Sequence, residues 1–208
     1  MEVELSVFKS LKDVKVVFDV GARTDMLYDG PGVEVHRFEP NPEFASSLSG
    51  IVNRFGLSDK EEELSYNTVT QSFVNGKEYP RRIYGWGPSF PLKTLDQYAK
   101  DIPRIDFLKI DAEGMDYKIL LGGKETLKKT RYIQFEYWDG VQKFIDLLPD
   151  FELSLILDSR LYNDVIKPRV TDEKYEKPLV SLTEDVVHLI DKVCIPLGAG
   201  GNIFGIRK

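Results

Sequence analysis

The sequence has few cysteines and histidines, the side chains from which many reactive sites are built. Its single cysteine, Cys194, excludes a disulfide within the chain and favours an intracellular, reducing compartment. Cys194 lies in an apolar run, which indicates a buried small side chain rather than a nucleophile. The two histidines, His36 and His188, lie inside a predicted strand and a predicted helix, where a packed or solvated histidine is more common than a catalyst.

Long hydrophobic runs and an excess of positive charge are also missing. No apolar run approaches the roughly 20 residues that cross a bilayer, and the N-terminus has no signal-peptide pattern. The formal net charge is −6, from 28 basic and 34 acidic residues, which disfavours general binding to nucleic acid or anionic lipid. We therefore predict a cytoplasmic protein that binds neither nucleic acid nor membrane. The oligomeric state stays open.

Short apolar segments alternate with longer amphipathic ones, a pattern typical of βαβ units around a mostly parallel sheet. Seven strands are predicted, at residues 14–20, 33–38, 51–57, 105–110, 132–137, 151–157 and 203–206. Helices are predicted at residues 42–48, 94–100, 117–127, 140–148 and 183–193. Two stretches with prolines, 68–92 and 159–180, are predicted to be surface loops. The expected architecture is one α/β domain over residues 1–208, with helices on both faces of the sheet.

The ends of the first two predicted strands carry a nucleoside-binding pattern. Asp19 is followed by a turn at Gly21, and Glu39 comes eighteen residues after that glycine. A turn glycine lets the backbone approach a ligand, and a carboxylate at the end of the second strand is placed to accept both ribose hydroxyls. A dinucleotide would need two further glycines, where this chain has Arg23 and Met26, whose side chains would obstruct a pyrophosphate. The pattern favours S-adenosylmethionine, which has no phosphate.

Three further acids are predicted at the same sheet edge. Asp111 and Glu113 follow the strand 105–110, and Glu136 ends the next strand. Such a group suits proton abstraction, pairing with a cationic cofactor, or binding of Mg²⁺ or Mn²⁺, for which Asp111 and Glu136 are the candidate ligands. Lys109 would either orient a neighbouring group or extend to solvent. The sequence does not separate a carboxylate base from a metal-bound alkoxide.

Several blocks of the sequence, taken together, resemble the FkbM methyltransferase family. They are Phe18-Asp19-Val20-Gly21-Ala22, Phe38-Glu39-Pro40-Asn41-Pro42, Thr94-Leu95-Asp96, Leu108-Lys109-Ile110-Asp111-Ala112-Glu113-Gly114, Leu120-Leu121-Gly122-Gly123 and Asn202-Ile203-Phe204-Gly205-Ile206-Arg207-Lys208. The resemblance implies a Rossmann-like class I methyltransferase fold. It also implies methyl transfer from S-adenosylmethionine to a hydroxyl of a small molecule, commonly a sugar or glycan.

The resemblance also implies roles for matching positions. The cofactor-binding set is Asp19, Gly21, Ala22, Arg23, Glu39, Pro40, Asn41, Leu57, Ser58, Asp59 and Asp111. The catalytic set is Asp111, Glu113, Glu136 and Lys109, and one of its carboxylates would take the hydroxyl proton. One position departs from the family, which usually continues from the first glycine into Asn-x-Gly. Here Asp25 replaces the glycine, so we expect its side chain near the methionine tail, where it would pair with the ammonium or weaken binding.

Two other functions compete with methyl transfer. A degenerate member without turnover, serving as a binding subunit of a glycan-processing assembly, is supported by Asp25 and opposed by the intact acids. A nicotinamide-dependent oxidoreductase is disfavoured by Arg23 and Met26. The loop over residues 68–92 is predicted either to hold a sugar ring or to form a minor core, through Tyr79, Arg81, Arg82, Tyr84, Trp86 and Phe90.

Overall fold

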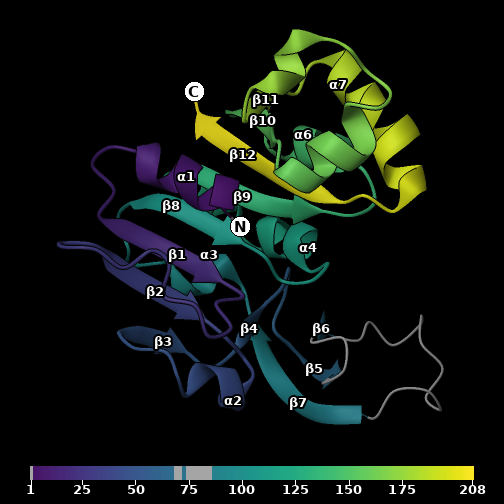
Figure 1. Cartoon of the computed structure of the whole chain (residues 1–208). Coiled ribbons are helices and arrows are strands. Elements are labelled where there is room, and N and C mark those ends of the chain that lie inside the picture. The colour runs from purple at the N-terminus through teal and green to yellow at the C-terminus, as the bar shows by residue number, and fades with distance from the viewer. Residues whose placement is uncertain (1, 68–71, 74–85) are drawn as a thin grey trace. The chain divides into compact units, whose positions relative to one another are not determined.

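The computed structural model describes residues 2–67, 72–73 and 86–208 (Figure 1). The chain forms two compact units. Lys15–Thr130 form the unit that is central in the sequence, called the central unit below, and Met1–Val14 with Arg131–Lys208 form the C-terminal unit. Among the described residues, no helix combines the length and the apolar character that a membrane crossing requires. A single domain over residues 1–208 stays a prediction.

Four parallel strands form the sheet of the central unit. They are β1 (Val16–Val20), β2 (Glu34–Phe38), β3 (Ile51–Asn53) and β8 (Ile105–Ile110), in the order β8-β1-β2-β3. All their pairings are parallel, and β1 and β8 are almost wholly buried, which explains their apolar sequences. From β1 the chain continues to one side for β2 and β3, then crosses to the other side for β8. Such a switch point, at the carboxyl ends of β1 and β8, is where open α/β sheets bind ligands.

Aromatic side chains cover one face of this sheet. Tyr98, from α3 (Leu95–Tyr98), packs edge-on against Phe18 of β1 and Phe38 of β2, at ring-centroid distances of 5.6 and 4.8 Å. The buried His36 lies beside them, with Nδ1 2.7 Å from the Tyr98 hydroxyl and Nε2 2.8 Å from Glu34 Oε1. His36 is therefore a packed histidine, as its place in a strand predicted.

The connection from β1 to β2 contains turns but no helix, and all of residues 21–33 are described. Tyr28 of this loop is buried against Phe107 of β8, with ring centroids 5.6 Å apart. Asp29 pairs with the buried Arg37 of β2 over 2.5 Å. A short loop thus replaces the helix that follows the first strand in dinucleotide-binding folds.

A second, smaller sheet belongs to the central unit and corrects two sequence predictions. Its order is β4-β7-β5-β6, formed by β4 (Gly56–Leu57), β7 (Trp86–Lys93), β5 (Glu62–Asn67) and β6 (Ser72–Phe73). The predicted strand 51–57 is two strands, β3 and β4, that join different sheets. The predicted loop 68–92 contains β6 and most of β7, because pairing with β5 outweighs the weak strand propensity of Gly87, Pro88 and Pro91.

The predicted helix 117–127 is broken in two by its glycines. The pieces are α4 (Asp116–Leu121) and α5 (Lys124–Lys128). A Cβ on Gly122 would lie 2.2 Å from the Ser58 carbonyl oxygen, and one on Gly123 would lie 2.8 Å from Leu95 Cδ1. The backbone contact requires a glycine at 122, whereas a side chain at 123 would have to displace the end of Leu95. Their block of the sequence serves the fold rather than the chemistry.

Hydrogen bonds to Asp96 hold the start of α5. One carboxylate oxygen, Oδ1, accepts from the backbone N–H and the hydroxyl of Thr126, both at 2.7 Å, and Oδ2 accepts from the Glu125 N–H at 3.1 Å. Thr94 forms a capping box with Gln97 at the start of α3. The Thr94-Leu95-Asp96 block is thus also structural. The remaining short helix, α2 (Pro42–Ala45), begins at the Asn41 cap.

In the C-terminal unit the strands follow the order β11-β10-β12-β9, and every neighbouring pair is antiparallel. They are β9 (Thr130–Tyr137), β10 (Phe151–Ile156), β11 (Leu179–Ser181) and β12 (Gly201–Arg207). Because β12 lies between β9 and β10, those two strands run in the same direction. The three-residue β11 was not predicted, so in the described part of the chain these strands and the parallel four of the central unit make eight rather than seven. The α/β, Rossmann-like architecture is as predicted.

Helical segments of several kinds complete the C-terminal unit. The α-helices are α1 (Glu2–Ser10), α6 (Gln142–Leu147) and α7 (Glu184–Leu189), of which α1 was not predicted. The π-helices are η1 (Leu161–Ile166) and η3 (Ile190–Cys194), and the 3₁₀ helices are η2 (Glu173–Glu176) and η4 (Ile195–Leu197). The predicted loop 159–180 therefore contains helical turns. Cys194 is buried, as predicted, and burial raises the pKa of its thiol to about 11.

The close packing of Gly122 predicts a large effect of one added methyl group. Gly122→Ala must displace the backbone at Ser58, so we expect the free energy of unfolding to fall by about 1–3 kcal/mol. Gly30→Ala is the matched control, because its Cβ would only touch Val33 Cγ2 at 3.5 Å. Urea denaturation of both variants measures the difference. Equal stability of the two variants would contradict the packing argument.

Candidate functional site

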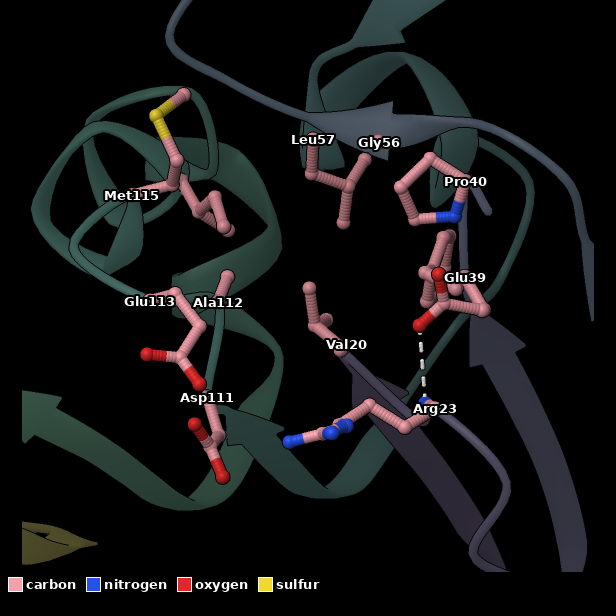
Figure 2. Close-up of a pocket in the computed structure, with 13 residues that line it drawn as sticks. Val20, Arg23, Glu39, Pro40, Gly56, Leu57, Asp111, Ala112, Glu113 and Met115 are labelled. Carbon is pink, nitrogen blue, oxygen red and sulfur yellow. Dashed lines mark hydrogen bonds between the residues drawn. The ribbon is translucent and has the colours of Figure 1, made fainter. Parts of the chain in front are cut away.

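A pocket opens at the carboxyl ends of β1, β2 and β8 in the central unit (Figure 2). It is lined by Val20, Gly21, Arg23, Phe38, Glu39, Pro40, Gly56, Leu57, Asp111, Ala112, Glu113, Met115 and Ile119. Figure 2 shows Met115 and Leu57 on one side, and Asp111 and Arg23 on the opposite side. Glu39 lies apart from the other two acids, Asp111 and Glu113. The pocket thus combines an apolar wall with separately placed charges.

The turn after β1 shapes the pocket because the backbones meet there. Gly21 has φ +76°, and a Cβ on it would lie 1.9 Å from the Asp111 carbonyl oxygen, so only glycine fits. The Gly21 N–H donates to the Phe38 carbonyl at 3.0 Å, and the Asp111 N–H donates to the Val20 carbonyl at 3.1 Å. These bonds tie the ends of all three strands together.

Glu39 presents a buried carboxylate that the backbone orients. It is 3% exposed, and its Oε2 accepts the Arg23 N–H at 2.9 Å, the bond drawn in Figure 2, while Oε1 accepts the Asn41 N–H at 2.8 Å. Burial raises the pKa of Glu39 above its ordinary value, although these hydrogen bonds and the Arg23 charge oppose the shift. A carboxylate has about four acceptor positions, so Glu39 keeps capacity for further donors.

Lys109 lies beneath the turn and connects three groups. Its ammonium is 3.2 Å from Asp19 Oδ1 and 3.7 Å from Asp111 Oδ2, and it donates to the Gly21 carbonyl at 3.3 Å. Burial opposes the charge of Lys109, but the attraction of Asp19 and Asp111 outweighs it and raises the pKa above its usual value. With a side chain only 12% exposed, Lys109 orients its neighbours instead of extending to solvent.

Two residues of the pocket have left-handed backbones. Arg23 and Glu113 both have φ of +51°, a region that costs a non-glycine residue roughly 1–2 kcal/mol. Such strain is found most often at functional sites. Partial desolvation of the Glu113 carboxyl raises its pKa, and the nearby negative charge of Asp111 raises the pKa further. The positive charges of Arg23 and Lys109 lower it.

The structure brings together only part of the predicted set. The predicted residues that line the pocket are Gly21, Arg23, Glu39, Pro40, Leu57, Asp111 and Glu113. Those that lie outside its lining are Asp19, Ala22, Asn41, Ser58, Asp59, Lys109 and Glu136. Asn41 caps α2 and holds Glu39, whereas Ser58 is buried and donates to Asp59 and Glu62. Asn41 and Lys109 thus support the pocket from outside its lining, by holding Glu39 and Asp111.

Sequence reasoning missed the apolar wall. The lining residues that were not predicted are Val20, Phe38, Gly56, Ala112, Met115 and Ile119. Val20, Phe38 and Ala112 lie within the blocks that resemble the family, so the resemblance could have indicated them. Met115 and Ile119 had no distinguishing signal, because apolar residues at the start of a helix read as ordinary core.

The predicted metal site is not supported. Asp111 belongs to the central unit and Glu136 to the C-terminal unit, where Glu136 accepts a hydrogen bond from Trp138 Nε1 at 2.7 Å. Within residues 2–67, 72–73 and 86–208, no group of three or more His, Cys, Asp or Glu side chains could hold a metal ion. The grouping of Glu136 with Asp111 and Glu113 stays a prediction.

Two further expectations concern loops. Asp25 is exposed and is not among the pocket's lining residues, and its expected contact with the methionine tail stays a prediction. Tyr79, Arg81, Arg82 and Tyr84 lie outside the described residues, as does the side chain of Trp86. The predicted sugar-holding loop is therefore untested.

The buried ion pair predicts a strong effect on stability. Lys109→Met leaves the 2%-exposed Asp19 without its partner, so we expect a loss of about 3–5 kcal/mol in the free energy of unfolding. Asp19→Asn combined with Lys109→Met removes both charges and should recover much of that loss. A double-mutant cycle from chemical denaturation measures the coupling, and strictly additive effects would rule out the pair.

Comparisons with known proteins agree with this geometry. The sequence model of the methyltransferase FkbM domain matches residues 19–158. The 2-O-methyltransferase NoeI of Sinorhizobium fredii (strain NBRC 101917 / NGR234) is 34% identical over an alignment of 190 residues that covers 73% of this chain and 78% of that protein.

Two solved structures are more distantly similar. The FkbM methyltransferase of Methylobacillus flagellatus KT is 16% identical with a TM-score of 0.47, over 71% of this chain and 41% of that one. The precorrin-6y C5,15-methyltransferase of Geobacter metallireducens GS-15 is 13% identical with a TM-score of 0.45, over 99% and 87%. The chain thus spans under half the length of the first of these structures. On the strength of the domain match and the 34% identity, the chain belongs to the FkbM family and is a methyltransferase.

Proposed function

We propose that the central-unit pocket binds S-adenosylmethionine and that the chain transfers its methyl group to a hydroxyl of a sugar or glycan. The charge of the pocket carries this proposal. Among the residues that the structure describes, three acids, Glu39, Asp111 and Glu113, line it with one cation, Arg23. Such a pocket attracts the cationic sulfonium and ammonium groups and repels a pyrophosphate. The 2-O-methyltransferase relative supports a hydroxyl as the acceptor.

The loop after β1 argues against a nicotinamide cofactor. Dinucleotides place their pyrophosphate on the N-terminus of the helix that follows the first strand. Residues 21–33, which are all described, contain no helix, and Arg23 lines the pocket instead of a second glycine. The anion-binding element of a dinucleotide site is therefore missing from this connection.

The pocket's own residues fit the parts of the cofactor. The remaining acceptor capacity of Glu39 suits the ribose hydroxyls, and the apolar wall with Leu57 and Met115 suits the adenine ring. Asp111, held by Lys109, suits the ammonium of the methionine part. When bound, S-adenosylmethionine supplies an electrophilic methyl group.

Glu113 is the proposed general base. A neutral hydroxyl is a weak nucleophile, and a carboxylate that accepts its proton strengthens the attacking oxygen. The raised pKa of Glu113 brings its basicity closer to neutral pH, where a general base works best. Its strained backbone holds the carboxylate at the pocket. Lys109 acts through Asp111 as a positioning residue.

The alternative of a binding subunit without turnover gains no support from the site. The argument for it rests on Asp25, which does not line the pocket, whereas Glu39, Asp111 and Glu113 do. A cytoplasmic location, and the lack of nucleic-acid or membrane partners, stay predictions from the sequence.

Calorimetric titration with S-adenosylmethionine tests the cofactor. Glu39→Gln keeps the shape of the side chain but weakens its hydrogen bonds to ribose, so we expect the affinity to fall about 10- to 100-fold. The control is Glu43→Gln, an exposed residue of α2 outside the pocket. Equal affinity of the two variants would refute the ribose contact, and absence of binding to the native chain would refute the proposed function.

Steady-state methylation kinetics at varied pH test the base. Glu113→Gln should lower kcat about 10²- to 10⁴-fold while leaving cofactor affinity nearly unchanged. The base must be ionised, so kcat of the native chain should fall as the pH drops through a pKa above the ordinary glutamate value. The charges facing Glu113 are those of Asp111, Arg23 and Lys109. Asp111→Asn, assayed at saturating cofactor, should therefore move the acidic limb to lower pH, and an unmoved limb would contradict this assignment.

A further inference from the structure

The C-terminal unit has a cavity of its own. Its volume is about 290 Å³, and it is open to solvent. Three segments line it: the end of β9, the region of η1, and the glycine-containing stretch 197–202 that leads into β12. None of these residues takes part in the cofactor site proposed above.

An exposed tryptophan at this cavity is held in a fixed orientation. Trp138 is 51% exposed, although large aromatic side chains are usually buried. Its indole N–H donates to Glu136 Oε2 at 2.7 Å. A Cβ on Gly200 would lie 2.8 Å from Trp138 Cε3, so the glycine backbone packs directly against the ring. The ring therefore offers a preoriented apolar surface to a ligand.

Polar groups of both hydrogen-bonding kinds line the same cavity. Asp158 and Asp164 contribute carboxylates, and the exposed Arg160 contributes a guanidinium. The Asp158 Oδ1 atom accepts the Leu161 N–H at 2.7 Å, which fixes this carboxylate at the start of η1. A sugar ring has an apolar face of C–H groups and an edge of hydroxyls that both donate and accept. An aromatic surface beside carboxylates and a guanidinium matches both features.

The backbone around the cavity is unusual. The π-helical turn η1 lines it, and so does the segment that follows η4, whose C-cap Gly198 has φ +68°. Isolated π-helical turns occur frequently at functional sites, because they redirect side chains at a cost in backbone energy. The local irregularity is thus consistent with a binding role.

We propose that this cavity is a saccharide-binding site, in which one sugar ring stacks on Trp138 and its hydroxyls bond to Asp158, Arg160 and Asp164. The assignment rests on the proposed function for the class of ligand, because a sugar methyltransferase must hold its acceptor. It goes beyond that function by naming the residues that recognise the acceptor. Glu136 takes the role of fixing the indole.

Tryptophan fluorescence measures binding directly. The chain has two tryptophans, so Trp86→Phe leaves Trp138 as the only one, and calorimetry on the native chain checks that this substitution does not itself alter sugar binding. Titration of this variant with methyl α-D-mannopyranoside, methyl β-D-galactopyranoside and N-acetylglucosamine should give a saturable change in emission for at least one sugar. A Kd of about 1 mM is expected, typical of a small polar ligand. Sorbitol, which has hydroxyls but no ring, should give no saturable change.

Calorimetry on the otherwise native chain then assigns the site. Trp138→Ala should abolish binding of the responding sugar, Trp138→Phe should retain it more weakly, and Arg160→Ala should weaken it roughly tenfold. Ile206→Ala, an exposed apolar residue of β12 outside the cavity, is the matched control and should bind normally. Circular dichroism and thermal unfolding verify that each variant is folded.

The outcomes separate this proposal from the cofactor assignment. Loss of sugar binding in folded Trp138→Ala with unchanged S-adenosylmethionine binding supports the site. Sugar binding that survives Trp138→Ala, or ring sugars that behave like sorbitol, overturns it. Sugar binding at Trp138 by a chain that does not bind S-adenosylmethionine would refute the proposed function and leave the saccharide site standing.

Discussion

The buried ion pair between Asp19 and Lys109 is the interaction on which the candidate site depends. Parallel pairing of β1 with β8 sets the two residues side by side in register, and pairing with β2 sets Arg37 on the other side of Asp19. Either charge, buried without a partner of opposite sign, would carry a large desolvation penalty. Together they place a cation under the Gly21 turn and beside Asp111. The backbone that surrounds the pocket is therefore fixed by electrostatics as much as by packing.

The blocks that the chain shares with its family divide into two physical classes. Glu39, Asp111 and Glu113 bring charge to the pocket, and Gly21 allows the strands to meet there. The Asp96 block instead caps the start of α5. The Gly122 block packs against the backbone of Ser58, the residue that follows β4. Strong resemblance along a sequence therefore does not by itself distinguish a residue that binds a ligand from one that supports the backbone behind it.

Much of the fold could be predicted from the sequence because buried parallel strands have long apolar runs. β1, β2 and β8, together with Gly21 and Glu39 at their ends, followed from local pattern alone. What failed depended on pairing between distant segments. β7 has prolines that local propensity assigns to a loop, and only its pairing with β5 makes it a strand. The break at Gly122 likewise depends on the Ser58 carbonyl, far away in the sequence.

The charged residues of the site could be predicted because their type implies a chemical role. The apolar lining residues could not, because their type does not. Acids at strand ends indicate function, whereas Met115 and Ile119 resemble any core residues until the pocket is seen. The sequence left open whether Lys109 orients a neighbouring group or extends to solvent. Its distances to Asp19 and Gly21 decide for the first interpretation. Asp25 is exposed, and its expected place near the methionine tail stays a prediction from the family resemblance.

The left-handed backbones of Arg23 and Glu113 have a consequence for how this protein can be altered. A glycine at either position would relieve the strain and raise stability, since only glycine adopts that conformation freely. It would also remove a charge from the pocket. Selection for thermal stability alone would therefore favour glycine at both positions. The resulting chain would be more stable but would lack two charges that the proposed function uses, so stability and the proposed activity place opposite demands on Arg23 and Glu113.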